Sequence, residues 1–160
     1  MAYVAGGLFQ VGYVTPDLDA FLATANGSLG VDRFMVLRDA KVSHQTFRGA
    51  SSLATQDLAF GNAGMFQIEV IAPTSGENTY TEFLAEHPQG GLHHVGALVE
   101  DYDAAVRDLG RHAPVAQTGQ AGGTRFAYLD TRPTLGSYTE IIQLDDQFAT
   151  VFAAILAQSF

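Results

Sequence analysis

The sequence predicts an α+β fold in which two βαβββ modules form a single domain over residues 1–160. Three observations support this prediction: an internal repeat with a constant spacing, helix start signals at matching places, and strand-like segments after each helix. Hydrophobic residues make up 47% of the chain and charged residues 16%, so there is enough apolar material to bury a core.

The repeat consists of short segments that recur 84 residues apart. The first copy has QVG at residues 10–12 and DLDA at 17–20, and the second has HVG at 94–96 and DYDA at 101–104. One offset maintained across a strand, a turn and a helix start is difficult to obtain by chance. We therefore interpret the two copies as equivalent parts of two modules.

Each copy begins with a strand and continues into a helix. Residues 8–15 and 92–99 are rich in β-branched and apolar side chains, which is typical of strands. Asp17 and Asp101 are of a residue type that often caps the first turn of a helix. The predicted helices span residues 17–26 and 101–109.

Three strand-like stretches follow each helix, separated by turns rich in Gly and Asn. They span residues 33–39, 53–60 and 65–72 in the first copy, and residues 113–117, 124–129 and 137–143 in the second. The closing strands are 71 rather than 84 residues apart, so the second module is 13 residues shorter. We attribute the difference to a loop at residues 41–52. The modules therefore span residues 8–73 and 92–143.

An Ala-rich apolar stretch at residues 146–158 predicts a C-terminal helix. Its large apolar side chains recur at helical spacing and fall on one face. They are Phe148, Val151, Phe152, Ile155 and Leu156. We expect this face to pack on the sheet or on a partner subunit.

The charge and composition exclude several classes of function. The net charge is −9 with only eight Lys and Arg, which argues against nucleic-acid or anionic-membrane partners because both require a basic surface. The absence of cysteine excludes disulfides, thiolate metal ligands and a cysteine nucleophile. Residues 1–9 lack the pattern of a signal peptide. We expect a cytoplasmic protein.

Four polar residues interrupt the first and last strands of the modules: Gln10, Glu69, His94 and Glu140. An isolated strand Glu usually lies on a solvated face, and an isolated His is more often structural than a ligand. Here Gln10 is equivalent to His94, and Glu69 to Glu140. Because an inward-facing carboxylate is costly unless it is paired, protonated or metal-bound, the matching positions favour a shared cation.

One nitrogen and three oxygen donors suit one divalent ion, with Zn, Ni, Co, Mn and Fe all compatible. Such an ion can act as a Lewis acid on a carbonyl oxygen and stabilise the enediolate that forms when the α proton is removed. A nearby carboxylate is the natural base for this step. The candidates for the base are Glu140 and Glu69.

Other residues are candidates for contacts with a substrate. Gln67 and Tyr138 lie two positions from ligands, on the same strand faces, and are expected to line the pocket. Half of the basic residues fall within residues 33–48, which indicates either a mixed surface with a mobile loop or a clamp for a carboxylate or acyl-CoA phosphates. Arg48 is the candidate for that clamp. His93 should point away from His94 and be structural.

Four segments resemble the vicinal oxygen chelate superfamily, which includes glyoxalase I, methylmalonyl-CoA epimerase, extradiol dioxygenases and the bleomycin and fosfomycin resistance proteins. They are FQVGYVTPDLDAFLA, FQIEVIAP, FLAEHPQGGLHHVGALVEDYDAAV and FAYLDTRPTLGSYTEIIQL, within residues 8–143. The resemblance is strongest to the epimerase-like branch, through FLAEHPQGGLHHVG and EVIAP. It implies that paired βαβββ modules form a curved mixed sheet around one metal ion, with ligands from the first and last strand of each module.

Carried over by position, this resemblance places the ligands at Gln10, Glu69, His94 and Glu140. Many members have His at the position of Gln10, and epimerases often have Gln at that of Glu69. The set is similar to that of animal-type glyoxalase I. The resemblance also implies a small carbonyl or acyl-thioester substrate and a homodimer.

The sequence therefore predicts a divalent-metal-dependent isomerase, epimerase or lyase that abstracts a proton α to a metal-bound carbonyl or thioester. The alternative is a non-catalytic small-molecule binding or resistance protein, against which the intact ligand set counts. An extradiol-type dioxygenase is disfavoured, because that chemistry uses two His and one carboxylate, and Gln10 stands where the first His is needed.

Overall fold

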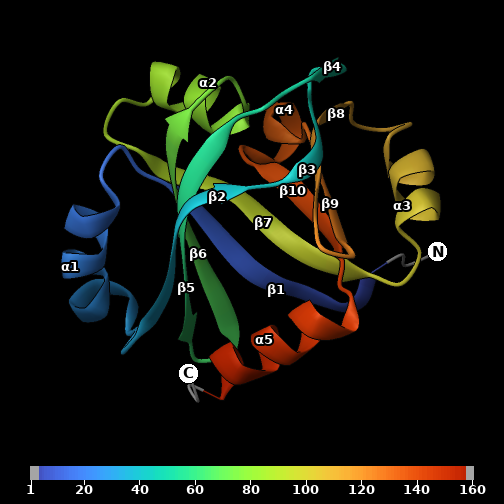
Figure 1. Cartoon of the computed structure of the whole chain (residues 1–160). Coiled ribbons are helices and arrows are strands. Elements are labelled where there is room, and N and C mark those ends of the chain that lie inside the picture. The colour runs from blue at the N-terminus through green and yellow to red at the C-terminus, as the bar shows by residue number, and fades with distance from the viewer. Residues whose placement is uncertain (1–3, 158–160) are drawn as a thin grey trace.

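Ten strands form one curved mixed sheet in the computed structural model, which describes residues 4–157 (Figure 1). The strands are β1 (Val4–Val14), β2 (Phe34–Lys41), β3 (Ser43–Phe47), β4 (Ala50–Ser51), β5 (Thr55–Ala63), β6 (Phe66–Ser75), β7 (Gly91–Val99), β8 (Val115–Ala121), β9 (Thr124–Leu129) and β10 (Tyr138–Gln143). The helices are α1 (Leu18–Leu29), α2 (Thr79–Glu86), α3 (Tyr102–Leu109), α4 (Arg132–Leu135) and α5 (Asp146–Leu156). The ends of the predicted 1–160 domain, and the end of the predicted C-terminal helix at residue 158, lie outside the described residues.

The sheet is built from two modules of the same topology. The strand order is β2-β5-β6-β1-β7-β10-β9-β8-β3-β4. From the centre outward, each module therefore contributes its first, fourth, third and second strand in chain order. Within each module the first and last strands are parallel. The first strands, β1 and β7, pair antiparallel and join the halves. This arrangement confirms the predicted fold class of two βαβββ modules in a curved mixed sheet.

The module helices begin as their N-cap residues predict. Asp17 accepts a hydrogen bond from the Ala20 amide at 3.0 Å, and Asp101 accepts one from the Ala104 amide at 2.9 Å. The first helix extends past the predicted end at residue 26, to Leu29. Its last turn is retained because Leu29 packs against the core of the first module, and Gly30 then ends the helix in the left-handed conformation.

The segment predicted as a loop at residues 41–52 contains a strand pair instead. β3 and β4 form a short hairpin, and β3 pairs antiparallel with β8 at the outer edge of the second module. Thr46 and Thr118 also share a hydrogen bond between their hydroxyls at 2.7 Å. The insertion of the first module therefore extends the sheet of the second, through a long-range pairing that local sequence patterns do not encode.

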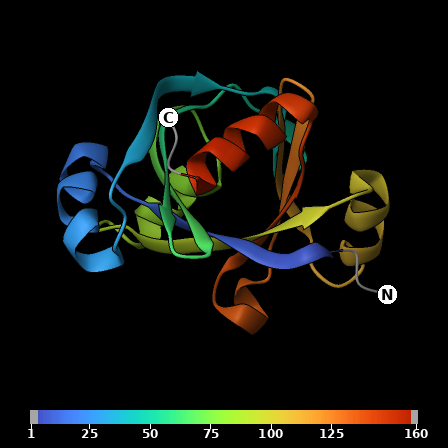
Figure 2. The same cartoon turned by 90° about the horizontal axis from the view of Figure 1, so that it is seen from below.

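Helices α1 and α3 each cover a separate hydrophobic cluster of the core. α1 packs on the first module and α3 on the second, over clusters that include Leu18 and Val70 in one and Ala105 and Ile141 in the other. α5 lies between the two wings of the sheet, away from α1 and α3 (Figure 2). Strands from both modules and α5 contribute residues to one cavity, which is described below. Within the described residues, no helix has both the length and the apolar character needed to span a membrane.

Candidate metal centre

The four predicted ligands lie together at the middle of the sheet. Gln10 on β1, Glu69 on β6, His94 on β7 and Glu140 on β10 occupy four adjacent strands of one chain, two from each module. The Nε2 atom of His94 lies 3.1 Å from Glu69 Oε2, 3.3 Å from Glu140 Oε2 and 3.3 Å from Gln10 Oε1. The side-chain donors therefore converge on one point without any contribution from a second chain.

The spacing and burial of these donors fit a divalent ion. Atoms that each lie about 2.0–2.2 Å from one ion are separated from one another by roughly 3.0–3.5 Å. Glu69 is 8% exposed and Glu140 is 4% exposed. The Oε2 atoms of both are buried, and neither accepts a hydrogen bond from the described part of the chain. Buried carboxylate oxygens without donors are costly, and a shared cation would remove that cost.

Two glycines make room for the ligands. Gly12 lies directly across from His94 in the β1–β7 pair, and a Cβ there would stand 1.8 Å from Cε1 of the His94 ring. Gly96 lies across from Gln10, and a Cβ there would stand 2.6 Å from Oε1 of Gln10. The glycine of each repeat copy thus leaves space for the ligand of the other copy, which explains the repeated QVG and HVG segments.

Neighbouring side chains orient two of the ligands. Gln10 Nε2 donates a hydrogen bond to Gln67 Oε1 at 2.7 Å, which directs the Gln10 amide oxygen toward His94. The Nδ1 atoms of His94 and His93 lie 3.1 Å apart. Because Nε2 of His94 faces the carboxylates, its Nδ1–H is the group that can donate to His93. A hydrogen bond at the second nitrogen is a common way to fix a metal-binding histidine.

Burial governs the protonation of these groups in the absence of an ion. Burial lowers the pKa of His94, but the adjacent carboxylates of Glu140 and Glu69 outweigh it and raise this pKa to about 9. Burial raises the pKa of Glu140, against the opposing effect of His94. Burial also lowers the pKa of His93 well below its ordinary value, so His93 is neutral and able to accept the hydrogen bond from His94.

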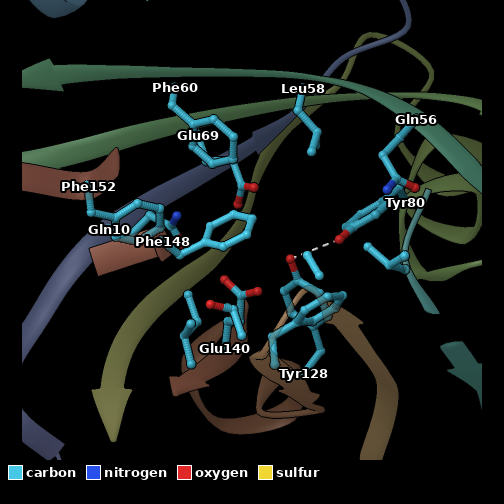
Figure 3. A pocket seen from close by; sticks show the side chains of 15 residues that line it. Gln10, Gln56, Leu58, Phe60, Glu69, Tyr80, Tyr128, Glu140, Phe148 and Phe152 are labelled. Carbon is cyan, nitrogen blue, oxygen red and sulfur yellow. Dashed lines mark hydrogen bonds between the residues drawn. The ribbon is translucent and has the colours of Figure 1, made fainter. Parts of the chain in front are cut away.

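A mainly apolar cavity lies against the carboxylates, and both Glu69 and Glu140 line it (Figure 3). Phe60 and Phe126 line it from the sheet, and Phe148 and Phe152 line it from α5. Asp145 fixes the start of α5 by accepting hydrogen bonds from the Phe148 amide and the Gly123 amide, both at 2.7 Å. The C-terminal helix, predicted to pack on the sheet or on a partner, therefore also forms one wall of the cavity.

Two tyrosines that the sequence did not single out also line the cavity. Tyr80 donates a hydrogen bond to the hydroxyl of Tyr128 at 2.9 Å, and the pair lies beside Glu140 (Figure 3). Burial raises the pKa of both well above the ordinary value, so both hydroxyls are neutral. Tyr128 pairs with Glu140 across β9 and β10, a relation that appears only once the strand register is known.

The three predicted substrate contacts do not line this cavity. Gln67 is engaged with Gln10, as described above. Tyr138 donates a hydrogen bond to Glu82 at 3.1 Å and packs against the His93 ring, which directs it toward α2. Arg48 binds both carboxylate oxygens of Glu82, at 2.8 and 2.6 Å. An acidic residue of α2 therefore holds Arg48 and Tyr138 away from the carboxylate pair.

The comparison with known proteins identifies the family. The family model of the Glyoxalase/Bleomycin resistance protein/Dioxygenase superfamily matches residues 9–128, which is 120 of the 160 residues. The chain belongs to this superfamily. A curated relative, mitochondrial methylmalonyl-CoA epimerase of Mus musculus, is 36% identical over 52 residues, a match that covers 32% of this chain and 29% of that protein.

Solved epimerase structures share the fold of this superfamily member. The methylmalonyl-CoA epimerase of Mycobacterium tuberculosis aligns with a TM-score of 0.65 and 19% identity, over 94% of this chain and 95% of that one. A variant of the Streptomyces coelicolor enzyme in complex with 2-nitronate-propionyl-CoA aligns with a TM-score of 0.59 and 18% identity, over 91% and 97%. At these identities the likeness establishes a common fold.

Proposed function

We propose that this protein is a divalent-metal-dependent enzyme that removes a proton α to a carbonyl or thioester, as an epimerase, an isomerase or a glyoxalase-type lyase. The observation that carries the proposal is the set of four converging donors beneath an apolar cavity, two of them buried carboxylates without hydrogen-bond donors. A divalent ion held by these side chains would polarise the carbonyl and so acidify the α proton.

The chain supplies two candidate bases in a nearly symmetric arrangement. Glu69 and Glu140 lie on β6 and β10, which flank the central β1–β7 pair, and each approaches Nε2 of His94 within 3.3 Å. With a substrate carbon between them, one carboxylate would remove the proton from one side, and the other, after taking up a proton from solvent, would return it from the opposite side. Two bases placed in this way suit inversion at the α carbon, which supports an epimerase among the three reaction types.

The comparisons support a thioester as the substrate class. The solved relatives include methylmalonyl-CoA epimerase structures in complex with methylmalonyl-CoA and with 2-nitronate-propionyl-CoA. Those ligands belong to the relatives, and we extend only the acyl-thioester or 2-oxo class to this chain.

The competing proposal is a protein of the same fold that binds a small molecule without turnover. The buried carboxylate pair argues against it, because a passive apolar site gains nothing from two such groups.

Solvent deuterium exchange at the α carbon tests this proposal. The protein is loaded with a divalent metal and offered 2-oxo hemithioacetals and 2-methyl acyl-CoA thioesters, with metal content measured in parallel. We expect metal-dependent exchange for at least one compound. Glu140→Gln should reduce exchange by roughly 10²–10⁴, the usual contribution of a general base, and should lose only part of the metal because an amide oxygen remains.

Two further variants separate metal binding from catalysis. His94→Ala should lose metal and activity together, because it removes the nitrogen donor. Glu86→Gln is the matched control, since this exposed glutamate at the end of α2 lies outside the cavity. If no compound exchanges while some ligand binds tightly and unchanged, the non-catalytic binding protein is the better description.

A further inference from the structure

The cavity above the carboxylates has no basic side chain among the described residues that line it. Arg125 follows a lining residue in the sequence, but it points to the opposite face of β9, where it binds Asp103 at 2.7 and 3.0 Å and lies over the ring of Tyr102. Arg48 is bound to Glu82. A ligand inside the cavity therefore meets no cation other than one held by the metal centre itself.

The charges of the centre cancel when it is loaded. Two carboxylates, Glu69 and Glu140, balance the two positive charges of one divalent ion, while Gln10 and a neutral His94 add none. A carboxylate on the substrate would then bring one net negative charge into a buried site. Burying a charge without a partner costs far more than burying an uncharged group of the same size.

The walls are correspondingly apolar. Leu58, Phe60 and Phe126 come from the sheet, and Phe148 and Phe152 come from α5. The polar groups beyond the centre are uncharged and include the tyrosine hydroxyls described above. One of them, the Gln56 amide oxygen, is buried without a hydrogen-bond donor. This oxygen can only accept a hydrogen bond, so it offers none to a carboxylate, which is itself an acceptor.

We infer that the part of the substrate held in this cavity is an uncharged, apolar group, aromatic or branched alkyl, and not a free carboxylate such as that of a malonyl thioester. This inference rests on the proposed function and narrows its substrate class. It separates this chain from the relatives that it resembles, because methylmalonyl-CoA, the ligand in one of their structures, carries a free carboxylate on the reacting carbon. Phe148 and Phe152 of α5 are the specificity-determining residues.

A pair of matched probes tests the inference by binding alone. Hexanohydroxamate and adipate monohydroxamate share the same metal-binding head and differ by a terminal methyl or carboxylate. Calorimetric titration of the full-length, zinc-loaded protein should show at least about tenfold tighter binding of the alkyl probe, because its end enters the apolar cavity without desolvating a charge. Phe148→Ala should weaken the alkyl probe by roughly three- to tenfold at unchanged zinc content.

A positive charge introduced into the cavity wall should change the preference for the alkyl probe over the carboxylate probe. Leu58→Lys places a cation in the cavity and should narrow or reverse the difference between the probes, whereas Leu53→Lys, at a side chain that is 91% exposed, should not. Equal affinity of the two probes for the parent protein, or no binding of the alkyl probe, overturns the inference.

Deuterium exchange distinguishes this outcome from failure of the proposed function. Exchange of a malonyl thioester as fast as of its uncharged analogue overturns the inference and leaves the function intact. Selective binding of the alkyl probe without exchange of any compound supports the inference about the cavity and removes the proposed reaction.

Discussion

Replacing Gly12 with alanine should push His94 out of the candidate metal centre. The added Cβ would stand 1.8 Å from Cε1 and 2.2 Å from Nε2 of the His94 ring, whereas comfortable contacts between heavy atoms begin at about 3.5 Å. The ring must therefore move by roughly 1.7 Å. The rings of Tyr128 and His93, with centroids at 5.0 and 5.3 Å, limit that movement. We expect a loss of about 1–3 kcal/mol in stability, the usual cost of overpacking a core.

The same displacement should weaken metal binding. Coordination tolerates errors of only about 0.2 Å in donor distance, so a shift of this size should lower metal affinity by at least about 10–100-fold. Gly96→Ala should be milder, because its Cβ meets mainly the flexible end of Gln10, with Oε1 at 2.6 Å. Both effects follow from the β1–β7 register, in which each glycine faces the ligand of the other module.

Metal affinity by competition with a chromophoric chelator, together with thermal unfolding of the metal-free protein, measures both effects. Gly27→Ala is the matched control, because a Cβ at this position in α1 meets no atom within 4 Å and should stabilise the helix by about 0.5–1 kcal/mol. Wild-type metal affinity in Gly12→Ala would refute the argument that this glycine creates the space for His94.

Three further predictions concern protonation. Because the pKa of His94 is raised to about 9 without metal, metal binding at pH 7.5 should release at least one proton, measured by calorimetry in buffers of different ionisation enthalpy. Without metal, His94 stabilises the fold fully below about pH 6.5, its ordinary pKa, and this contribution should disappear as pH rises through 9. Arg48 lowers the pKa of Glu82, so Glu82→Gln should cost about 0.5–1 kcal/mol at pH 7 and little near pH 3, by denaturant unfolding.

The near-symmetric centre follows from the duplication within the chain. Gln10 and His94 occupy the same place in the two modules, and so do Glu69 and Glu140. Joining the modules through their first strands brings all four positions onto adjacent strands. The differences between the copies then set the chemistry: one nitrogen donor, one amide oxygen and two carboxylates. A change at one position alters the donor type without altering the geometry that the backbone provides.

The sequence by itself determined the two βαβββ modules and the positions of the candidate metal ligands. The repeat, the N-cap residues Asp17 and Asp101 and the alternation within strands are local patterns, and each is fixed by steric rules that act over a few residues. The same patterns singled out Gln10, His94 and the two glutamates, because polar residues at matching places in apolar strands stand out without any knowledge of contacts.

Tertiary structure decided what surrounds those positions. The pairing of β3 with β8, the path of α5 over the cavity and the approach of Tyr80 to Tyr128 join segments that are far apart in the chain. Such contacts depend on strand register and on which side chains the fold brings close together, as it does for Glu82 and Arg48. Local periodicity gives the face on which a residue lies. The neighbour that it meets there is set by the packing of the whole sheet.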